Sequence, residues 1–429
     1  MKEGHMMNST IKVGYACLNL DLDRGFKTCR FANLTTEKWI ELISWNLETL
    51  KQMLIYTADH NIQMLRLSSD LIPFATKAKD DVNLDWQAYF QDEFDALKKL
   101  IKNLDIRISF HPGQYTVLNS PKEDVVERAI ADLDYHADLL ALLGGDQSNK
   151  MVIHIGGVYG DKDAAIQRFI QVANSLSSKI RRHLIIENDE RLFNIEDVLY
   201  ISQLTHLPVV FDNLHFNILK PENSRSMKTY IELAGQTWTT NDGRQAIHYS
   251  QQALCKKPGA HTNTTALNPF IHFIQNELSG PIDIMLEVKD KNRSAEKIQL
   301  YLDQDIGAAE KLWARYKYDV MAKSLSIYQA IRNLLKDKEN TDFEAFIQYL
   351  ETAENLPEDI GNEINAGQHI WGYFKNQATD TERGEFKRNQ EKLQNQEISI
   401  TQFRRYLKQL LKKYPNPYLT DSIYFKPFK

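Results

Sequence analysis

Apolar residues along this chain occur either in short continuous runs or in longer stretches with helical spacing. Runs such as LII over 184–186 and PVVF over 208–211 are typical of parallel strands that are buried on both faces. Apolar residues three and four positions apart, clearest over 36–60, instead indicate amphipathic helices. Eight strands are predicted, at 11–19, 62–69, 106–112, 151–157, 183–189, 208–215, 245–250 and 282–289. Eight strand–helix units within about 300 residues predict an α/β fold, namely a (β/α)8 TIM barrel.

The pattern changes near residue 311, beyond which only helices are predicted. We therefore expect a disordered N-terminus over 1–10, a barrel over 11–310 and a small all-α C-terminal domain of unknown role over 311–429. A single helix over 289–312 should lead from the barrel into that domain. The C-terminal helices are predicted at 314–337, 343–356, 363–377 and 400–414.

Charge differs between the two expected domains. Residues 311–429 hold 19 Lys/Arg and 16 Asp/Glu, and the remainder holds 33 and 41. An acidic barrel can bind cations that offset part of its charge. The helix over 400–414 has a basic face, formed by Arg404, Arg405, Lys408, Lys412 and Lys413. That face is either an accessory DNA-binding surface or an ordinary solvated surface, and the solvated interpretation is slightly favoured.

The composition, 42% hydrophobic and 25% charged, is that of an ordinary globular protein. No apolar run approaches the roughly 18 residues of a membrane span, and the N-terminus has no signal-peptide core, so no membrane partner is expected. Three cysteines without CxxC spacing favour a reducing cytoplasm over a disulfide framework. The absence of G-x-G-x-x-G, P-loop and G-x-S-x-G motifs argues against a nucleotide cofactor and a serine hydrolase. We expect a cytoplasmic monomer.

Histidines and carboxylates follow the predicted strand cores, at the end where barrel enzymes assemble their active sites. Unpaired charge at the end of a buried strand is costly, and a metal ion would explain it. Five histidines and three carboxylates suffice for two or three ions such as Zn, Mn or Fe(II), and multi-metal sites perform in-line displacement at phosphorus. Taken singly, a strand histidine is more often an ordinary core residue. The candidate ligands are His111, His154, Glu187, Asp212, His215, His248, His261 and Glu287.

Several longer motifs occur in a fixed order over 11–292: KVGYACLN, SSDLIPF, SFHPGQY, VIHIGG, IENDER, VVFDNLHF, KKPGAH and IMLEVK. Together they resemble the UV damage endonucleases. The resemblance implies a TIM barrel similar to endonuclease IV enzymes and sugar isomerases. It also implies a DNA repair enzyme that nicks double-stranded DNA immediately 5′ of cyclobutane pyrimidine dimers and 6-4 photoproducts, and at some abasic sites. That family requires divalent metal, usually Mn²⁺.

Carried over by position, the resemblance makes all eight candidate ligands metal-binding, with Glu187 bridging two ions. Two or three Mn²⁺ ions are expected, with Mg²⁺ or Zn²⁺ as alternatives, and metal-activated water would attack the phosphate. Glu187, Asp212, His248 and Glu287 are the expected catalytic residues. Some relatives carry a lysine two residues before the strand-seven histidine, where this chain has Ala246.

The resemblance also implies residues that contact DNA. One tyrosine–asparagine pair would touch the extruded lesion, and a glutamine–tyrosine pair at a loop tip would fill the gap that it leaves. The residues themselves, and not the resemblance, suggest that two lysines before a Pro-Gly turn contact phosphates, and an ordinary solvated charge pair is equally expected there. The candidate DNA-binding residues are Tyr15, Asn19, Gln114, Tyr115, Lys256 and Lys257.

Three rival functions remain open at this point. An abasic-site endonuclease could use the same barrel without a preference for photoproducts. A metal-dependent sugar isomerase would need small polar pocket residues in place of a DNA groove. A non-enzymatic damage-binding protein is disfavoured by the full ligand set. At the C-terminus, the segments KYDVMAK, HIWGYFK and YLTDSIYFKPF resemble an uncharacterised helical domain that is also fused to other proteins.

Overall fold

The structure is a computed structural model that describes residues 11–77 and 82–426. The N-terminus over 1–10, for which disorder was predicted, lies outside the described residues. The chain divides between Gln299 and Leu300 into two compact units. The domain boundary expected at 310/311 falls inside a helix of the second unit, and its exact position stays a prediction.

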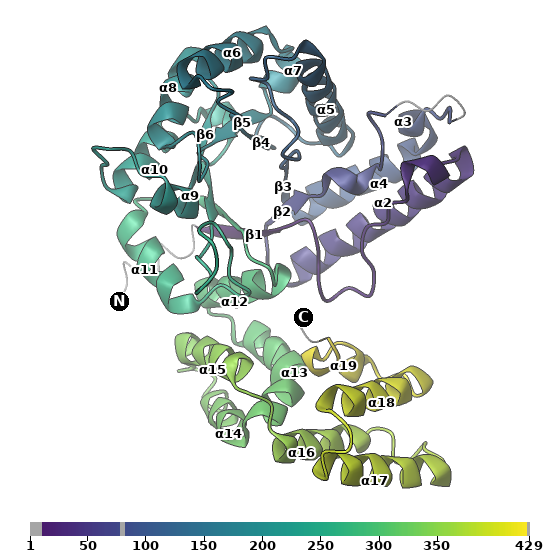
Figure 1. Cartoon of the computed structure of the whole chain (residues 1–429). Coiled ribbons are helices and arrows are strands. Elements are labelled where there is room, and N and C mark those ends of the chain that lie inside the picture. Colours follow the sequence, from purple (N-terminus) through teal and green to yellow (C-terminus); the bar gives the residue numbers. More distant parts are fainter. Residues whose placement is uncertain (1–10, 78–81, 427–429) are drawn as a thin grey trace. The chain divides into compact units, whose positions relative to one another are not determined.

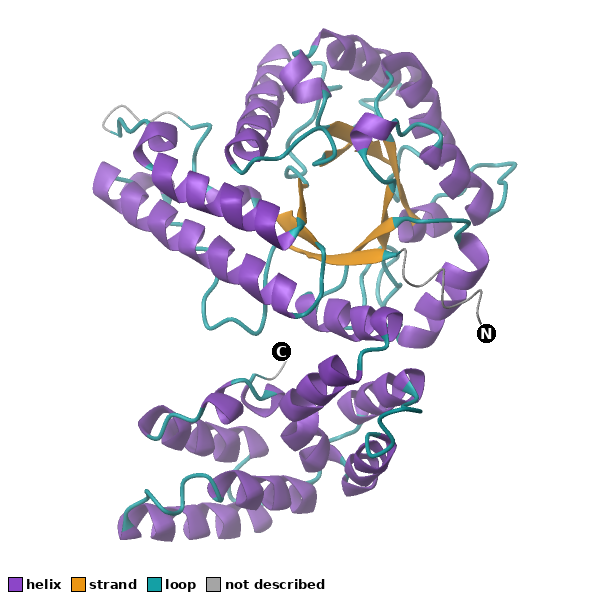
Figure 2. Ribbon diagram, turned by 180° about the vertical axis from the view of Figure 1, so that it is seen from behind, coloured by secondary structure: helices purple, strands orange, loops and turns teal. Residues whose placement is uncertain are grey.

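Eight parallel strands close into a barrel in sequence order, which confirms the predicted TIM barrel (Figures 1 and 2). Every strand is shorter than predicted, because most of the polar residues after the strand cores lie beyond the strand ends, whereas His154, Glu187 and Asp212 are the last residues of their strands. Gly14 shows how closely the strands approach, since a Cβ atom there would lie 2.4 Å from the Cβ of Met64. The strands are β1 Lys12–Ala16, β2 Met64–Leu67, β3 Arg107–Phe110, β4 Met151–His154, β5 Leu184–Glu187, β6 Val209–Asp212, β7 Ala246–Tyr249 and β8 Asp283–Leu286.

Helices surround the ring of strands (Figure 1). The first of them begins after Thr35, whose side chain accepts a hydrogen bond from the Lys38 N–H and so caps the helix. Its apolar stripe, including Trp39, Leu42 and Leu50, is buried. The helices and short 3-10 turns are η1 Phe31–Asn33, α2 Thr36–Asp59, η2 Ser69–Leu71, α3 Trp86–Tyr89, α4 Gln91–Leu104, α5 Glu123–Leu142, α6 Lys162–Ser175, α7 Ser178–Arg181, α8 Ile195–Thr205, α9 Asn213–Ile218, α10 Met227–Gly235, η3 Thr240–Asp242, α11 Leu267–Glu277 and α12 Asn292–Asp303.

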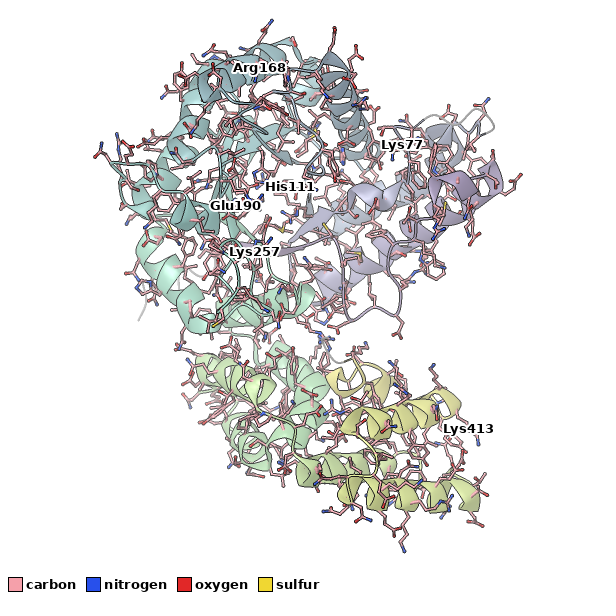
Figure 3. All side chains as sticks on the ribbon, viewed as in Figure 1. Lys77, His111, Arg168, Glu190, Lys257 and Lys413 are labelled. Atoms are coloured by element: carbon pink, nitrogen blue, oxygen red, sulfur yellow. The ribbon has the colours of Figure 1, made fainter. Side chains whose placement is uncertain are left out.

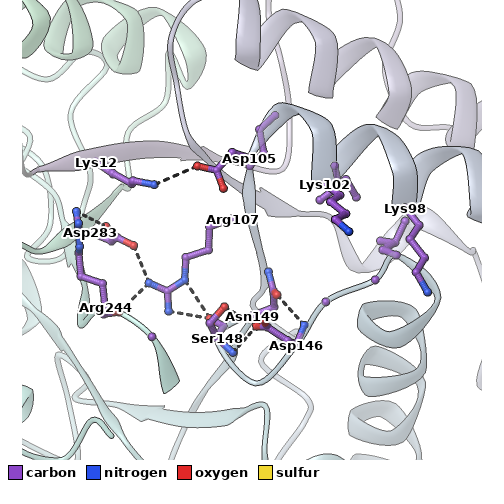
Figure 4. Close-up of a pocket in the computed structure, with 16 residues that line it drawn as sticks. Lys12, Lys98, Lys102, Asp105, Arg107, Asp146, Ser148, Asn149, Arg244 and Asp283 are labelled. Carbon is purple, nitrogen blue, oxygen red and sulfur yellow. Dashed lines mark hydrogen bonds and ion pairs between the residues drawn. The ribbon is translucent and has the colours of Figure 1, made fainter. Parts of the chain in front are cut away.

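The N-terminal ends of the strands carry a pocket of their own (Figure 4). Arg107 at the start of β3 pairs with Asp283 at the start of β8, with 2.7 Å between Nη1 and Oδ2. Lys12 and Arg244 also line this pocket and lie 3.8 Å from Asp105 and 3.5 Å from Asp283, respectively. None of the residues that line it belongs to either of the two groups of side chains, among the described residues, that could hold a metal ion.

The second unit consists of helices, as predicted, but their boundaries differ. The single helix predicted over 289–312 is wrong, because Gln304 has φ +52° and Asp305 caps a new helix at Gly307 N–H. The helix predicted over 314–337 breaks at Ser324, whose hydroxyl caps the next helix through Ile327 N–H. The elements are α13 Ile306–Lys323, α14 Leu325–Leu334, α15 Phe343–Asn355, α16 Ile360–Trp371, α17 Asp380–Gln394, α18 Ile400–Lys413, α19 Pro417–Thr420 and η4 Ile423–Phe425.

The basic face predicted for α18 is incomplete. Arg404 turns into the unit, where its Nη2 lies 2.7 Å from Glu363 Oε2 and its Nη1 lies 3.2 Å from Asp319 Oδ1. Its guanidinium also lies over the ring of Tyr424, 4.4 Å from the ring centre. Lys408 donates to the carbonyl of Phe425. The prediction that Arg404 belongs to a surface face is therefore wrong, because the buried Glu363 and the half-buried Asp319 hold its guanidinium inside.

Among the described residues, no helix combines the length and the apolar character that crossing a membrane requires.

Candidate metal centre

Strand register brings the predicted ligands to one rim of the barrel. His154 pairs with Glu187 across β4 and β5, and Asp212 pairs with His248 across β6 and β7. Three of these are the last residues of their strands, so their side chains stand at the C-terminal end of the barrel. Glu287 follows directly after β8 at the same rim.

Glu187 is the centre of this cluster and is only 1% exposed. Its Oε2 lies 3.2 Å from His111 Nε2 and 3.7 Å from His154 Nε2. Its Oε1 lies 2.8 Å from His248 Nδ1 and 3.6 Å from His215 Nδ1. Each oxygen of one buried carboxylate therefore faces a different pair of imidazoles, which is the arrangement that a bridging ligand needs.

Two groups of side chains have ligand atoms within 4.8 Å of one another, and both could hold a metal ion. One group is His111, His154 and Glu187, and the other is Glu187, Asp212 and His248. Asp212 Oδ2 and His154 Nδ1 are buried without a hydrogen-bond partner among the described residues, although buried polar atoms normally have one. The neutral imidazole and carboxylate donors match those of Mn²⁺ and Zn²⁺ sites, so the residues present fit a divalent metal.

Three predicted ligands lie at the edge of these groups. His261 Nε2 is 3.9 Å from Glu287 Oε2. His215 Nδ1 is 3.8 Å from Asp212 Oδ1 and donates a hydrogen bond to the carbonyl of Asn188, 2.9 Å away. Neither group contains His215, His261 or Glu287, and metal binding by all eight candidate ligands stays a prediction.

Burial and the charges of neighbouring side chains shift the pKa values of residues in this cluster. Burial would raise the pKa of Glu187, but His248 and His154 outweigh it and hold that pKa well below its usual value. Burial raises the pKa of Asp212 to about 6 against the opposing effect of His215. Burial would lower the pKa of His215, but the charges of Asp212 and Glu187 raise it to about 9. Any proton held by Asp212 or His215 would compete with a bound cation, because metal ligands must be deprotonated.

The predicted DNA-contacting residues fall into two classes. Tyr115 is 84% exposed, and Gln114, Lys256 and Lys257 are exposed as well. Tyr15 is fully buried, and its hydroxyl lies 2.8 Å from Thr57 Oγ1 and 3.1 Å from Asn19 Nδ2. The exposed residues are accessible to a macromolecule. Lesion contact by Tyr15 and Asn19 stays a prediction, and it requires that the hydrogen bonds between Tyr15, Thr57 and Asn19 rearrange.

Two residues near the cluster were not predicted. Arg66 donates from Nη1 to Glu287 Oε1 inside the barrel. Glu190 Oε2 lies 3.7 Å from His215 Nε2, and Figure 3 shows Glu190 with His111 and Lys257 in the region that the barrel helices enclose. A sequence signal existed for Arg66, since it interrupts the otherwise apolar strand MLRL. Glu190 carries no such signal, because it follows Asp189 in a polar loop.

Comparisons with known proteins agree with the family that the barrel motifs resemble. Residues 11–313 match the family described as UV-endonuclease UvdE. A UV DNA damage endonuclease from Clostridium perfringens (strain 13 / Type A) is 40% identical over 289 residues, which are 67% of this chain and 69% of the relative. The UV-damage endonuclease of Schizosaccharomyces pombe (strain 972 / ATCC 24843) is 31% identical over 304 residues, covering 66% of this chain and 49% of that protein.

A solved structure and a second family complete the comparison. The crystal structure of SacUVDE is 39% identical with a TM-score of 0.64, and the match covers 68% of this chain and 98% of that one. Residues 317–429 match a family described as a protein of unknown function, DUF1722.

Proposed function

The chain belongs to the UV-endonuclease UvdE family, and on this premise we propose that it is a divalent-metal-dependent endonuclease that nicks double-stranded DNA immediately 5′ of UV photoproducts. The observation that carries the proposal is Glu187, a single buried carboxylate shared by two ligand groups at the catalytic rim of the barrel. Cyclobutane pyrimidine dimers and 6-4 photoproducts are the proposed lesions, with abasic sites as additional substrates.

The proposed metal is Mn²⁺, in two or three ions. His111, His154 and Glu187 would hold one ion, and Glu187, Asp212 and His248 would hold a second. His215, His261 and Glu287 would extend the centre to a further ion. When bound, such ions supply Lewis acidity, an activated water and neutralisation of phosphate charge.

The protein's own groups prepare this chemistry. The imidazoles of His111 and His248 lie beside different oxygens of Glu187, so the carboxylate could contribute one oxygen to each ligand group. Asn188 fixes the strand end beside it, since its amide donates to the carbonyl of Asp212 and its oxygen accepts from Asp212 N–H. These contacts hold the ligand atoms before any substrate arrives, which lowers the cost of organising them during the reaction.

Exposed residues near the same rim suit the DNA. Base stacking on an exposed aromatic ring such as Tyr115 tolerates any base, so it can fill a gap in a duplex. Gln114 beside it can satisfy the hydrogen-bonding groups of an unpaired base. Lys256 and Lys257 would neutralise phosphates. A crosslinked dimer is poorly stacked and paired, so extruding it costs less than the few kcal/mol that intact bases require.

The proposal is tested with three duplexes that carry a single cyclobutane dimer, a single abasic site or no damage. With Mn²⁺ the protein should nick the dimer duplex and leave the undamaged duplex intact, and chelation should abolish the reaction. Glu187→Gln and Asp212→Asn should remove cleavage, whereas Glu123→Gln, an exposed carboxylate on α5, should not. Cleavage of the abasic duplex alone would favour the abasic-site endonuclease. Wild-type cleavage by Glu187→Gln would overturn the metal assignment.

A further inference from the structure

Arg66 lies inside the barrel although its strand is otherwise apolar. It is the third residue of β2 and is 9% exposed. Its neighbours in register are Ala16 on β1 and Ser109 on β3, both with small side chains. Strand β1 lies between β2 and β8. The small side chain of Ala16 on β1 leaves room for the Arg66 side chain to extend across β1 and reach Glu287.

The contacts of Glu287 divide its two oxygens. Oε1 accepts a hydrogen bond from Arg66 Nη1, and His248 Nδ1 lies 3.3 Å from the same oxygen. Oε2 instead faces His261, whose Nε2 is 3.9 Å away. One oxygen is therefore held by a guanidinium and an imidazole, and the other is directed toward a predicted metal ligand.

The Arg66 guanidinium has further capacity to bind. Its Nε is buried and has no hydrogen-bond partner among the described residues, whereas a guanidinium offers five N–H donors in a rigid fork. If Arg66 served only to pair with Glu287, we would expect it to donate two hydrogen bonds to the carboxylate, because bidentate pairing is stronger than a single hydrogen bond.

We propose that Arg66 is a positioning residue of the metal centre, which holds Glu287 Oε1 so that Oε2 is presented to a divalent cation. The inference rests on the proposed function, because it assumes that the centre binds Mn²⁺. Partners that hold a ligating carboxylate in this way fix its orientation, and their loss typically weakens metal affinity by 10–100-fold. A purely structural ion pair would leave metal affinity unchanged.

The test measures Mn²⁺ binding directly by equilibrium dialysis of the full chain, without DNA. Arg66→Met removes the guanidinium and should raise the Mn²⁺ dissociation constant by about 10–100-fold. Arg66→Lys keeps the charge without the planar fork and should give a smaller rise. Arg107→Met is the matched control, because Arg107 also pairs with a buried carboxylate, Asp283, but at the opposite strand ends (Figure 4). It should reduce the melting temperature and leave Mn²⁺ affinity as in wild type.

Three results would overturn the inference. A wild-type dissociation constant in Arg66→Met would make Arg66 a structural residue only, and a lower one would make it a competitor of the cation. If Arg66→Met does not fold by circular dichroism, Arg66→Lys decides, and a wild-type constant there rejects the inference. Failure of the proposed function looks different, since the wild-type chain itself would then bind no Mn²⁺.

Discussion

At the scale of single residues, some members of the proposed metal centre could be predicted from the sequence and others could not. Glu187 and Asp212 could be named from the sequence because each ends an apolar strand, and the C-terminal ends of parallel strands meet at one rim. Arg66 could not be assigned in this way. Its partner Glu287 is 221 positions away in the chain, and only the closure of the barrel through β1 brings the two together.

Tyr115 permits a test of damage recognition that is separate from stability. It is 84% exposed, so Tyr115→Ala should change the free energy of unfolding by no more than about 0.5 kcal/mol. If its ring stacks on bases, the variant should lose about 1–3 kcal/mol of binding to dimer-containing duplex. Fluorescence anisotropy with dimer and undamaged duplexes measures this loss, with Tyr89→Ala, at 56% exposure, as the control. Equal affinities of Tyr115→Ala and wild type for the dimer duplex would remove Tyr115 from the recognition site.

At the scale of elements, periodicity predicted the eight strands in order but not where helices break. The breaks at Gln304 and Ser324 depend on one left-handed residue and on two side-chain caps, at Asp305 and Ser324. The apolar spacing continues on both sides of each break, so spacing alone predicts one continuous helix. The side-chain caps end one helix and start the next because their hydrogen bonds compete with those of the helix. Helix α17 was not predicted, because Phe386 and Leu393 are its only buried residues and its sequence is otherwise polar.

The η3 element offers a test of pH dependence. Burial would raise the pKa of Asp242, but hydrogen bonds from Lys150, Thr239 and Gln147 lower it to about 2. An unfolded aspartate titrates near pH 3.9, so this carboxylate stabilises the fold above about pH 4, and the contribution is lost as the pH falls toward 2. Asp242→Asn should therefore be less stable than wild type at pH 7, and the difference should shrink between pH 5 and pH 3 in urea unfolding.

A matched control keeps that measurement specific. Asp105→Asn removes a carboxylate whose side chain is 86% exposed, and its stability should follow wild type within about 0.5 kcal/mol at each pH. A difference between Asp242→Asn and wild type that stays constant from pH 7 to pH 3 would show that the Asp242 charge does not stabilise the fold.

Helix α18 offers a pair of adjacent arginines with opposite environments. Arg404 is held by Glu363 and Asp319, so Arg404→Met should destabilise the C-terminal unit by about 3–5 kcal/mol, because it leaves a buried carboxylate unpaired. Arg405 is exposed, and Arg405→Met should stay within about 0.5 kcal/mol of wild type. Thermal unfolding of the full chain compares them, and equal melting temperatures would contradict the buried role of Arg404.

For the whole molecule, sequence similarity and fold agree over the barrel and leave the C-terminal unit without a function. The barrel matches its family over residues 11–313, whereas residues 317–429 match one of unknown function. The proposed metal centre lies entirely in the first unit, so cation binding should stabilise that unit alone.

This expectation can be measured by calorimetry. At 100 times its dissociation constant, Mn²⁺ should add about 2.7 kcal/mol to the stability of the barrel. The melting temperature of the barrel transition should therefore rise, while the transition of the C-terminal unit should not move. Glu187→Gln should show no such rise. An equal rise in Glu187→Gln would place the bound ion elsewhere in the molecule.

The most direct test of the account is the position and chemistry of the nick. A duplex with one cyclobutane dimer and a 5′ label on the damaged strand is incubated with the protein and Mn²⁺, and the products are sized to one nucleotide. The account predicts one cut immediately 5′ of the dimer, with a 3′-hydroxyl that a polymerase extends, and no product from Glu187→Gln. An uncut dimer strand, or cuts that ignore the dimer and also occur in undamaged duplex, would contradict it.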